Sequence, residues 1–281
     1  MDSQIKSNYH SHSTFCDGRF SIREMAEAAV KKNFTHFGFS GHSMFPFAGD
    51  WHIPLKDFKS YVEEVRVVKN EFKDKIKFFL GFEADYIQGI CFPDFSCYSE
   101  FSPDYLIGSV HYIPGENGFI VADDSPDEFA QRLNKYFKGN VKSAVCEYFY
   151  NERQMLSKCS FSILGHPDLI KKQNARYEIF SENESWYKKE LKAFAREIAR
   201  SGVCVEINTG GIARSNLKEP YPSLYFLELL KEKNVPVTIN SDAHDADKID
   251  YWFDEAESFA IKAGYKEIGY FENGQLKFRS I

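Results

Sequence analysis

Short apolar segments alternate with longer amphipathic segments along the whole chain. The short segments predict buried strands at about 5–10, 35–40, 76–83, 104–110, 161–165, 203–208 and 235–241. In the longer segments apolar residues recur every three or four positions, which is typical of helices packed through one face. These helices are expected from Ser21 and from Pro54 onward, and over roughly 126–138, 140–158, 183–201, 222–233 and 253–263.

The regular alternation of strand and helix predicts parallel strands joined by crossover helices. Seven or eight such units in one chain favour a closed barrel, and we expect an α/β fold of the TIM-like barrel type. An open doubly wound sheet is the structural alternative, but the sequence lacks the GxGxxG and GxxxxGK(S/T) motifs of its nucleotide-binding forms. No linker or internal repeat divides the chain, so residues 1–281 are expected to form a single domain.

The composition is that of an ordinary globular protein. Of the 281 residues, 43% are hydrophobic and 27% charged, which excludes disordered, collagen-like and coiled-coil chains. The formal charge is −6 and no run of basic residues exceeds two, so we expect no nucleic-acid partner. The sequence contains neither an apolar run long enough for a membrane helix nor an apolar signal segment. The six cysteines form no CxxC pair, and we expect reduced thiols in a cytoplasmic protein without a membrane partner.

Histidines and acidic residues gather where the predicted strands end. Since the carboxyl ends of parallel barrel strands open onto one face, side chains at these ends are expected to converge. A lone histidine there is most often structural, but imidazoles and carboxylates clustered in one place need a partner charge, which a metal cluster supplies. Six of the eight histidines and two carboxylates occupy such positions: His10, His12, His42, Glu83, His111, His166, Asp242 and His244.

Two histidines fall outside this pattern. His36 lies inside the second predicted strand, and we interpret it as structural. His52 lies on the loop after that strand, where it either lines a substrate pocket or occupies the surface.

The spacing of the strand-end residues resembles the PHP (polymerase and histidinol phosphatase) superfamily. His10-Ser11-His12, followed by Asp17-Gly18, is similar to the opening HxH…DG motif of that family. The later motifs have counterparts in the same order: Gly41-His42, Phe82-Glu83, Val110-His111, Gly165-His166 and Asp242-Ala243-His244. The resemblance extends from residue 8 to residue 244. It implies a distorted (β/α)7 barrel with two or three divalent metal ions at the carboxyl ends of its strands.

The family pattern also implies which residues hold each ion. The ligands of the first ion would be His10, His12, Glu83 and Asp242. Glu83 would bridge to the second ion, which His111 and His166 complete, and the third would be held by Asp17, His42 and His244. No cysteine is among these ligands, so the nitrogen and oxygen donors leave zinc, iron and manganese open.

The implied charge of the site favours a phosphate substrate. Three carboxylates and three divalent ions leave a net charge of about +3, which suits a phosphate dianion and the metal-assisted hydrolysis of a monoester. Asp17 or His244 is expected to handle the proton of the attacking water or of the leaving alkoxide. Arg214, just past a strand end, is expected to clamp the phosphate through its planar fork of donors. Further candidates for binding substrate are one of the two adjacent lysines, Lys171 or Lys172, and His52.

Several segments resemble the histidinol-phosphatase branch of the family. They are Glu206-Ile207-Asn208-Thr209, the region from Arg214 to Tyr221, and the aromatic loop from His42 to Trp51. This implies an enzyme that converts L-histidinol phosphate to L-histidinol and phosphate in histidine biosynthesis. Two alternatives stay open: a related phosphoesterase for another ester, such as phosphotyrosine or a nucleotide, and a barrel that binds metal without turnover. The exposed aromatic residues of the loop are expected to form either a substrate lid or a contact in a homo-oligomer.

Overall fold

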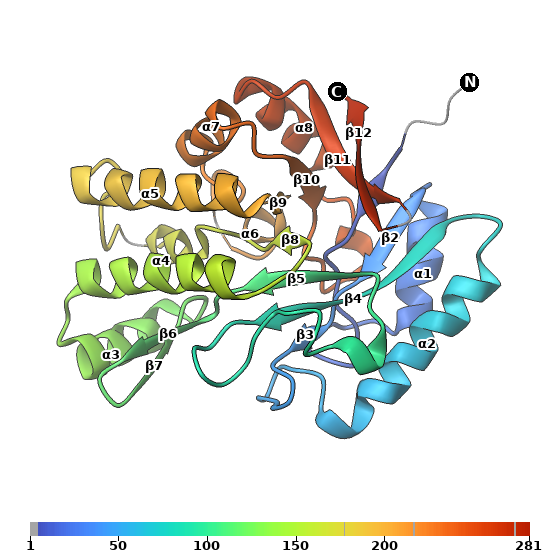
Figure 1. Cartoon of the computed structure of the whole chain (residues 1–281), viewed down its shortest axis with the longest axis horizontal. Coiled ribbons are helices and arrows are strands. Elements are labelled where there is room, and N and C mark those ends of the chain that lie inside the picture. Colours follow the sequence, from blue (N-terminus) through green and yellow to red (C-terminus); the bar gives the residue numbers. More distant parts are fainter. Residues whose placement is uncertain (1–4, 177, 216, 273) are drawn as a thin grey trace.

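A barrel of parallel strands forms the centre of the molecule (Figure 1). The computed structural model describes residues 5–176, 178–215, 217–272 and 274–281. Every neighbouring pair in the barrel is parallel, and a short extra strand, β3 (His42–Ser43), pairs with the carboxyl end of β4. This arrangement confirms the predicted α/β barrel. Around the ring the strands are β1 (Ser7–Asn8), β2 (His36–Phe39), β4 (Lys77–Asp85), β5 (Tyr105–Ser109), β8 (Ile163–Leu164), β9 (Cys204–Asn208) and β10 (Val237–Asn240).

The first and last strands meet through only a few contacts. Ser11 and Ala243 form a single parallel bridge, and the amide of His12 donates to the carbonyl of Ala243 at 2.9 Å. Nearby, the amide of Tyr9 donates to the side-chain oxygen of Asn240 at 2.8 Å. A side chain therefore replaces part of the regular ladder, and the barrel is distorted and nearly closed.

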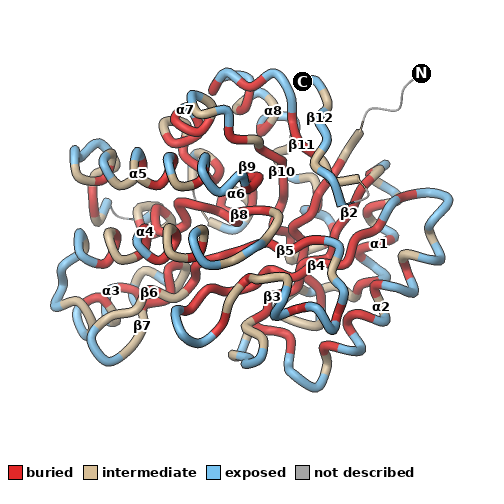
Figure 2. Tube along the Cα trace, viewed as in Figure 1, coloured by how far each residue is buried: buried red, intermediate tan, exposed pale blue. Residues whose placement is uncertain are grey.

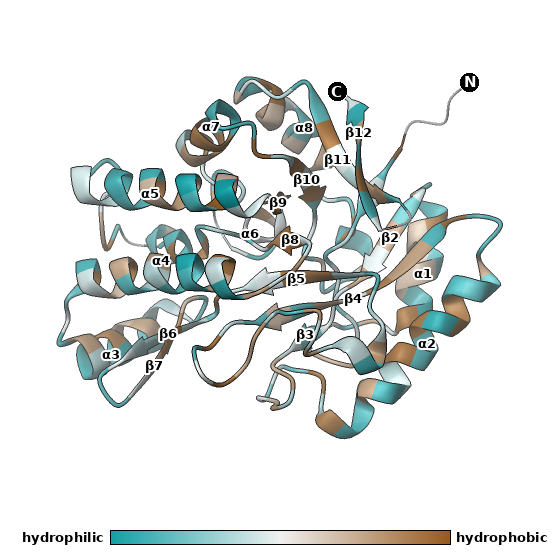
Figure 3. Ribbon diagram, viewed as in Figure 1, coloured by the Kyte–Doolittle hydropathy of each residue, from teal (hydrophilic) through white to brown (hydrophobic). Residues whose placement is uncertain are grey.

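Helices surround this barrel and cover its outer face (Figure 1). The strands are buried along their length and the helices expose their outer faces (Figure 2). Apolar residues are concentrated accordingly in the strands and on the inner helix faces (Figure 3). In the described part of the chain, no helix has the length and apolar character to cross a membrane. The α-helices are α1 (Ile22–Lys31), α2 (Phe58–Glu71), α3 (Pro126–Phe137), α4 (Val141–Lys158), α5 (Ser185–Ser201), α6 (Gly210–Arg214), α7 (Leu224–Glu232) and α8 (Phe253–Lys262). Short 3-10 helices are η1 (Leu55–Asp57), η2 (Ser99–Phe101), η3 (Leu169–Asn174) and η4 (Ala246–Lys248).

Helix ends follow the local signals of the sequence. At the start of α1 the hydroxyl of Ser21 accepts the amide of Glu24, whose carboxylate accepts the amide of Ser21 in return, so the capping box is confirmed. Helix α5 ends at Gly202, whose φ of 73° lies in the left-handed region that glycine adopts without steric cost. After Pro54 the chain first forms the turn η1, and α2 begins at Phe58.

Two antiparallel hairpins were not expected from the sequence. The first joins β6 (Tyr112–Gly115) to β7 (Gly118–Val121), and the second joins β11 (Glu267–Glu272) to β12 (Gln275–Ser280). Asn117, in the turn of the first hairpin, has a φ of 63°. The dipeptide Asn117-Gly118 is a strong hairpin signal that the helix and strand periodicity does not register.

The second hairpin covers the amino ends of the barrel strands. Glu272 of β11 forms an ion pair with Lys77, the first residue of β4. Inside the barrel, the rings of Tyr9 and Tyr105 pack edge to face at 5.6 Å, and Phe271 of β11 packs on Tyr9 at 5.3 Å. Aromatic residues therefore fill this end of the barrel among the described residues, and the carboxyl ends of the strands lie at the opposite end.

Candidate metal centre

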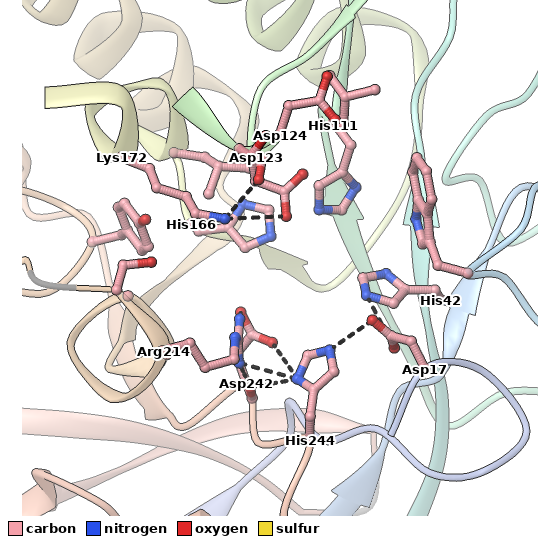
Figure 4. Close-up of a pocket in the computed structure, with 18 of the residues that line it drawn as sticks. Asp17, His42, His111, Asp123, Asp124, His166, Lys172, Arg214, Asp242 and His244 are labelled. Atoms are coloured by element: carbon pink, nitrogen blue, oxygen red, sulfur yellow. Dashed lines mark hydrogen bonds and ion pairs between the residues drawn. The ribbon is translucent and has the colours of Figure 1, made fainter. Parts of the chain in front are cut away.

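The strand-end residues line or underlie one cavity of about 390 Å³ at the carboxyl ends of the strands (Figure 4). Below the lining residues lie His10, His12 and Glu83, all almost completely buried. Every one of the nine metal ligands expected from the family pattern is brought to this region. Those that line the cavity are Asp17, His42, His111, His166, Asp242 and His244.

One carboxylate, that of Glu83 on β4, lies at the centre of the cluster. The hydroxyl of Ser109 on the neighbouring strand β5 also donates to it, at 2.9 Å. A single buried carboxylate therefore faces imidazoles from both sides, which is the arrangement of a ligand that bridges two cations. The distances to imidazole nitrogens are 2.8 Å (His42), 3.1 Å (His10) and 3.6 Å (His12) from Oε2, and 2.8 Å (His166) and 3.4 Å (His111) from Oε1.

A second group of donors lies beside the first, toward solvent. Asp17 Oδ2 is 3.1 Å from Nε2 of His244, and Asp17 Oδ1 is 3.7 Å from Nε2 of His42. Asp242 Oδ1 is 3.2 Å from Nε2 of His12. Three sets of donor atoms lie within 4.8 Å of one another: His10, His12 and Glu83; His42, Glu83 and His111; and His12, Asp17, His42 and His244.

The unpaired atoms of the cluster fit a metal centre. Among the described residues, Nε2 of His10, Nε2 of His12, Nδ1 of His42 and Oε2 of Glu83 are buried and make no aligned hydrogen bond, although they lie within ion-pair distance of one another. Buried polar atoms normally have partners because an unsatisfied one costs roughly 1–3 kcal/mol. Divalent cations would satisfy these nitrogen and oxygen donors together, so the donor set fits two or three such ions.

Two carboxylates of the cluster are held ionised by their surroundings, as metal ligands must be. Burial alone would raise the pKa of Glu83, but the surrounding imidazoles, His10 first among them, hold it well below its usual range. Asp242 behaves in the same way, with Arg214 and His10 lowering its pKa against the effect of burial. Burial and the neighbouring imidazoles of His244 and His42 lower the pKa of His12, which keeps that ring neutral and able to bind metal.

A buried glutamate on β9 orients the first histidine, and the sequence interpretation did not assign it this role. Glu206 accepts from Nδ1 of His10 at 2.9 Å and from the amide of His166 at 2.8 Å. The side-chain amides of Asn208 and Asn240 donate to its other lone pairs at 2.7 and 2.9 Å. Such a contact fixes the tautomer of His10, so that Nε2 faces the cluster. A charged residue inside a buried strand is the signal that would have marked Glu206.

Asp85 has the same role for His111. It lies two residues after Glu83 on β4, and its oxygens are 2.6 Å from Nδ1 of His111 and 2.6 Å from Nε2 of His52. Burial would raise the pKa of the Asp85 carboxyl, but these two imidazoles hold it well below its usual range. Because of the same contact, the pKa of His111 is raised to about 10, against the effect of burial.

The expected substrate residues do not all reach the cavity. Arg214, from α6, lines it, donates to Asp242 Oδ2 at 2.8 Å and lies 3.0 Å from Nδ1 of His244. His52 is buried behind the wall: its Nδ1 accepts the amide of Gly49 at 3.1 Å while Nε2 faces Asp85. Its predicted contact with substrate is therefore replaced by a role in orienting Asp85.

Of the two adjacent lysines, the structure favours the second. Lys171 is buried and directs its ammonium away from the cavity, to the carbonyl of Pro220 at 2.7 Å and to Glu219 at 3.3 Å. Lys172 lines the cavity instead. Successive residues of η3 point in different directions, so only one of the pair can face the site. His36 is buried in β2 and stacks on Phe79, in agreement with a structural residue.

The chain is similar to known proteins over most of its length. Residues 8–210 match the PHP domain family. A probable histidinol-phosphatase of Schizosaccharomyces pombe is 26% identical over 286 aligned residues, covering 94% of this chain and 89% of that protein. The histidinol-phosphatase of Bacillus subtilis is 24% identical, over 89% of this chain and 97% of the relative. A solved histidinol phosphate phosphatase of Lactococcus lactis, in complex with zinc, L-histidinol and phosphate, has a TM-score of 0.71 at 22% identity, over 98% of this chain and 100% of that chain.

Proposed function

The chain belongs to the PHP domain family, and from that premise we propose that it is a metal-dependent phosphomonoesterase. Its substrate would be L-histidinol phosphate, which it would hydrolyse to L-histidinol and phosphate as a step of histidine biosynthesis. The observation that carries the proposal is the buried carboxylate of Glu83 among five imidazoles, at the open end of the barrel. The substrate follows from the relatives that match nearly the whole chain and are named histidinol-phosphatases.

The donor set supports two or three divalent ions, with zinc, iron and manganese as candidates. The nine proposed ligands are those of the family pattern, from His10 to His244. Such ions polarise the oxygens of a phosphoryl group and lower the pKa of bound water. The carboxylates of Glu206 and Asp85 hold the rings of His10 and His111 in the orientation that this chemistry needs.

The residues around the cavity supply the remaining functions. Arg214 and Lys172 line it as cations and would bind phosphoryl oxygens. Nδ1 of His244 lies 3.1 Å from the backbone carbonyl of Asp242, so a proton on Nδ1 would donate there and leave Nε2, 3.1 Å from Asp17, free to bind the third ion. Asp17 or His244 would also handle the proton of the attacking water or of the leaving alkoxide.

The test is phosphate release from L-histidinol phosphate by protein of measured metal content. We expect a kcat/KM of about 10⁴ M⁻¹s⁻¹ or more, an ordinary value for an enzyme on its own substrate. p-Nitrophenyl phosphate and a nucleotide serve as control esters, and Glu83→Gln should lose both metal and activity. If metal-loaded protein hydrolysed all esters equally slowly, the substrate would be wrong. If Glu83→Gln kept full activity, the metal cluster would be wrong.

A further inference from the structure

One wall of the cavity carries carboxylates instead of cations. Asp123, Asp124 and Glu128 all line it, just after β7 and at the start of α3. Figure 4 shows Asp123 and Asp124 on the opposite side of the cavity from Arg214 and His244. The proposed ligand scheme does not use these acidic residues.

Two of the three carboxylates already have close partners. Asp124 Oδ2 is 2.9 Å from Nε of Arg132. Glu128 accepts the hydroxyl of Ser125 at 2.6 Å, as part of the cap of α3. Both are therefore held by contacts that serve the local structure.

Asp123 retains the capacity to bind a cation. In the part of the chain that the structure describes, the ion pair of its carboxylate is with Lys172, at 3.7 Å. The shorter contact of that lysine, 2.7 Å, goes to the backbone carbonyl of Asp123 and not to the carboxylate. The side chain thus lies at the cavity without a direct hydrogen bond from an ammonium group.

The backbone around Asp123 is fixed on both sides. The amide of Ala122 donates to the carbonyl of His111 at 2.8 Å. Gln173 of η3 donates to the carbonyls of Ala122 and Asp124 at 2.9 and 3.0 Å. Together with Lys172, these bonds hold the backbone of the segment against η3, so the main chain that carries the carboxylate is in place before any ligand arrives.

We propose that Asp123 binds the ammonium group of the substrate and makes the enzyme selective for phosphate esters of amino alcohols. This inference rests on the proposed function. A metal cluster together with Arg214 attracts the phosphate but repels an ammonium group on the same molecule, so the amine needs an anionic partner of its own in the cavity. Asp123 is that partner, because it lies across the cavity from Arg214 and its carboxylate has no short ion pair.

The test compares two esters that differ only in the amine: L-histidinol phosphate and its deaminated analogue, imidazolylpropanol phosphate. For Asp123→Asn we expect the KM for L-histidinol phosphate to rise about tenfold to a hundredfold, the usual effect of losing a hydrogen bond to a charged group. Its kcat and metal content should stay close to those of the wild type, and the KM for the deaminated ester should not change. Asp124→Asn, whose carboxylate is paired with Arg132, is the matched control and should leave the ratio of the two KM values unchanged.

Two results would overturn the role of Asp123. An equal rise in KM for both esters would mean that the carboxylate only positions Lys172 for the phosphate. An unchanged KM for both would mean that it contacts no part of the substrate. Failure of the proposed function has a different signature, since the metal-loaded wild type would then hydrolyse neither ester.

Discussion

Replacing Glu206 by glutamine tests whether the carboxylates behind the cluster determine its affinity for metal. The side chain accepts hydrogen bonds from four groups and donates none. Burial would raise the pKa of its carboxyl, but His10, His166 and Asn208 together hold it below its usual range. Glutamine has the same shape but turns one of the two oxygens into a donor. At least one of the four donors, which include Nδ1 of His10, then loses its acceptor.

The expected effect has two parts. Leaving a buried donor unpaired costs about 1–3 kcal/mol of the free energy of unfolding in the metal-free protein. Loss of the carboxylate that orients His10 weakens metal binding about tenfold to a hundredfold, which is roughly 1.4–2.7 kcal/mol. Glu206 does not line the cavity, so the KM for substrate in fully loaded enzyme should change little.

Metal affinity is measured by titration against a competing chelator, and stability by denaturant unfolding of the metal-free protein. Glu152→Gln is the matched control. Glu152 is equally buried, and burial raises the pKa of its carboxyl well above the usual range. Its oxygens accept no hydrogen bond from a proposed ligand, so glutamine should replace it with little effect on metal affinity. If Glu206→Gln bound metal as tightly as the wild type, or if both variants lost affinity equally, the orienting role of Glu206 would be refuted.

Three further predictions concern single side chains. Burial and, to a smaller extent, Lys77 lower the pKa of His36 to about 4, so the unfolded chain takes up this proton first as the pH falls. His36 therefore contributes stability that is complete above pH 6.5 and is lost between about pH 6.5 and pH 4, by up to about 3 kcal/mol. In denaturant unfolding of the metal-free protein, His36→Phe should make the free energy of unfolding less dependent on pH in this range. An unchanged slope would contradict the assignment. Arg214→Ala should raise the KM for phosphate esters about tenfold or more in initial-rate assays, whereas an unchanged KM would make the arginine a bystander. Lys172→Met should also raise KM. Lys171→Met should leave KM unchanged and lower the free energy of unfolding by about 3 kcal/mol, because the buried carboxylate of Asp168, 3.7 Å from the Lys171 ammonium, loses its cation. The reverse pattern would mean that the two lysines are wrongly placed.

The ligands of the cluster were accessible to sequence reasoning because their placement is local. Eight of the nine lie at or just after the end of a predicted strand, whereas Asp17 was assigned from the family motif, and parallel strands of a barrel bring their carboxyl ends to the same face. His111, for example, needs only the end of β5 at Ser109 to be located correctly. The hairpin of β6 and β7 was missed because it is inserted between a barrel strand and the next helix. The periodicity used to predict helices and barrel strands does not indicate such an inserted hairpin. Only the Asn117-Gly118 turn marks it.

Residues that act through another side chain could not be assigned in this way. Glu206 lies on β9 and His10 follows β1, and nothing in the sequence around either residue states that they face each other across the barrel. That contact depends on closure of the ring between β10 and β1, which itself relies on Tyr9 and Asn240 instead of a regular ladder. A charged residue within a buried strand shows that a partner must exist, because an uncompensated buried charge is too costly. Which residue is the partner depends on how the barrel closes. The orientation of the His10 imidazole toward the proposed metal site depends on the same closure.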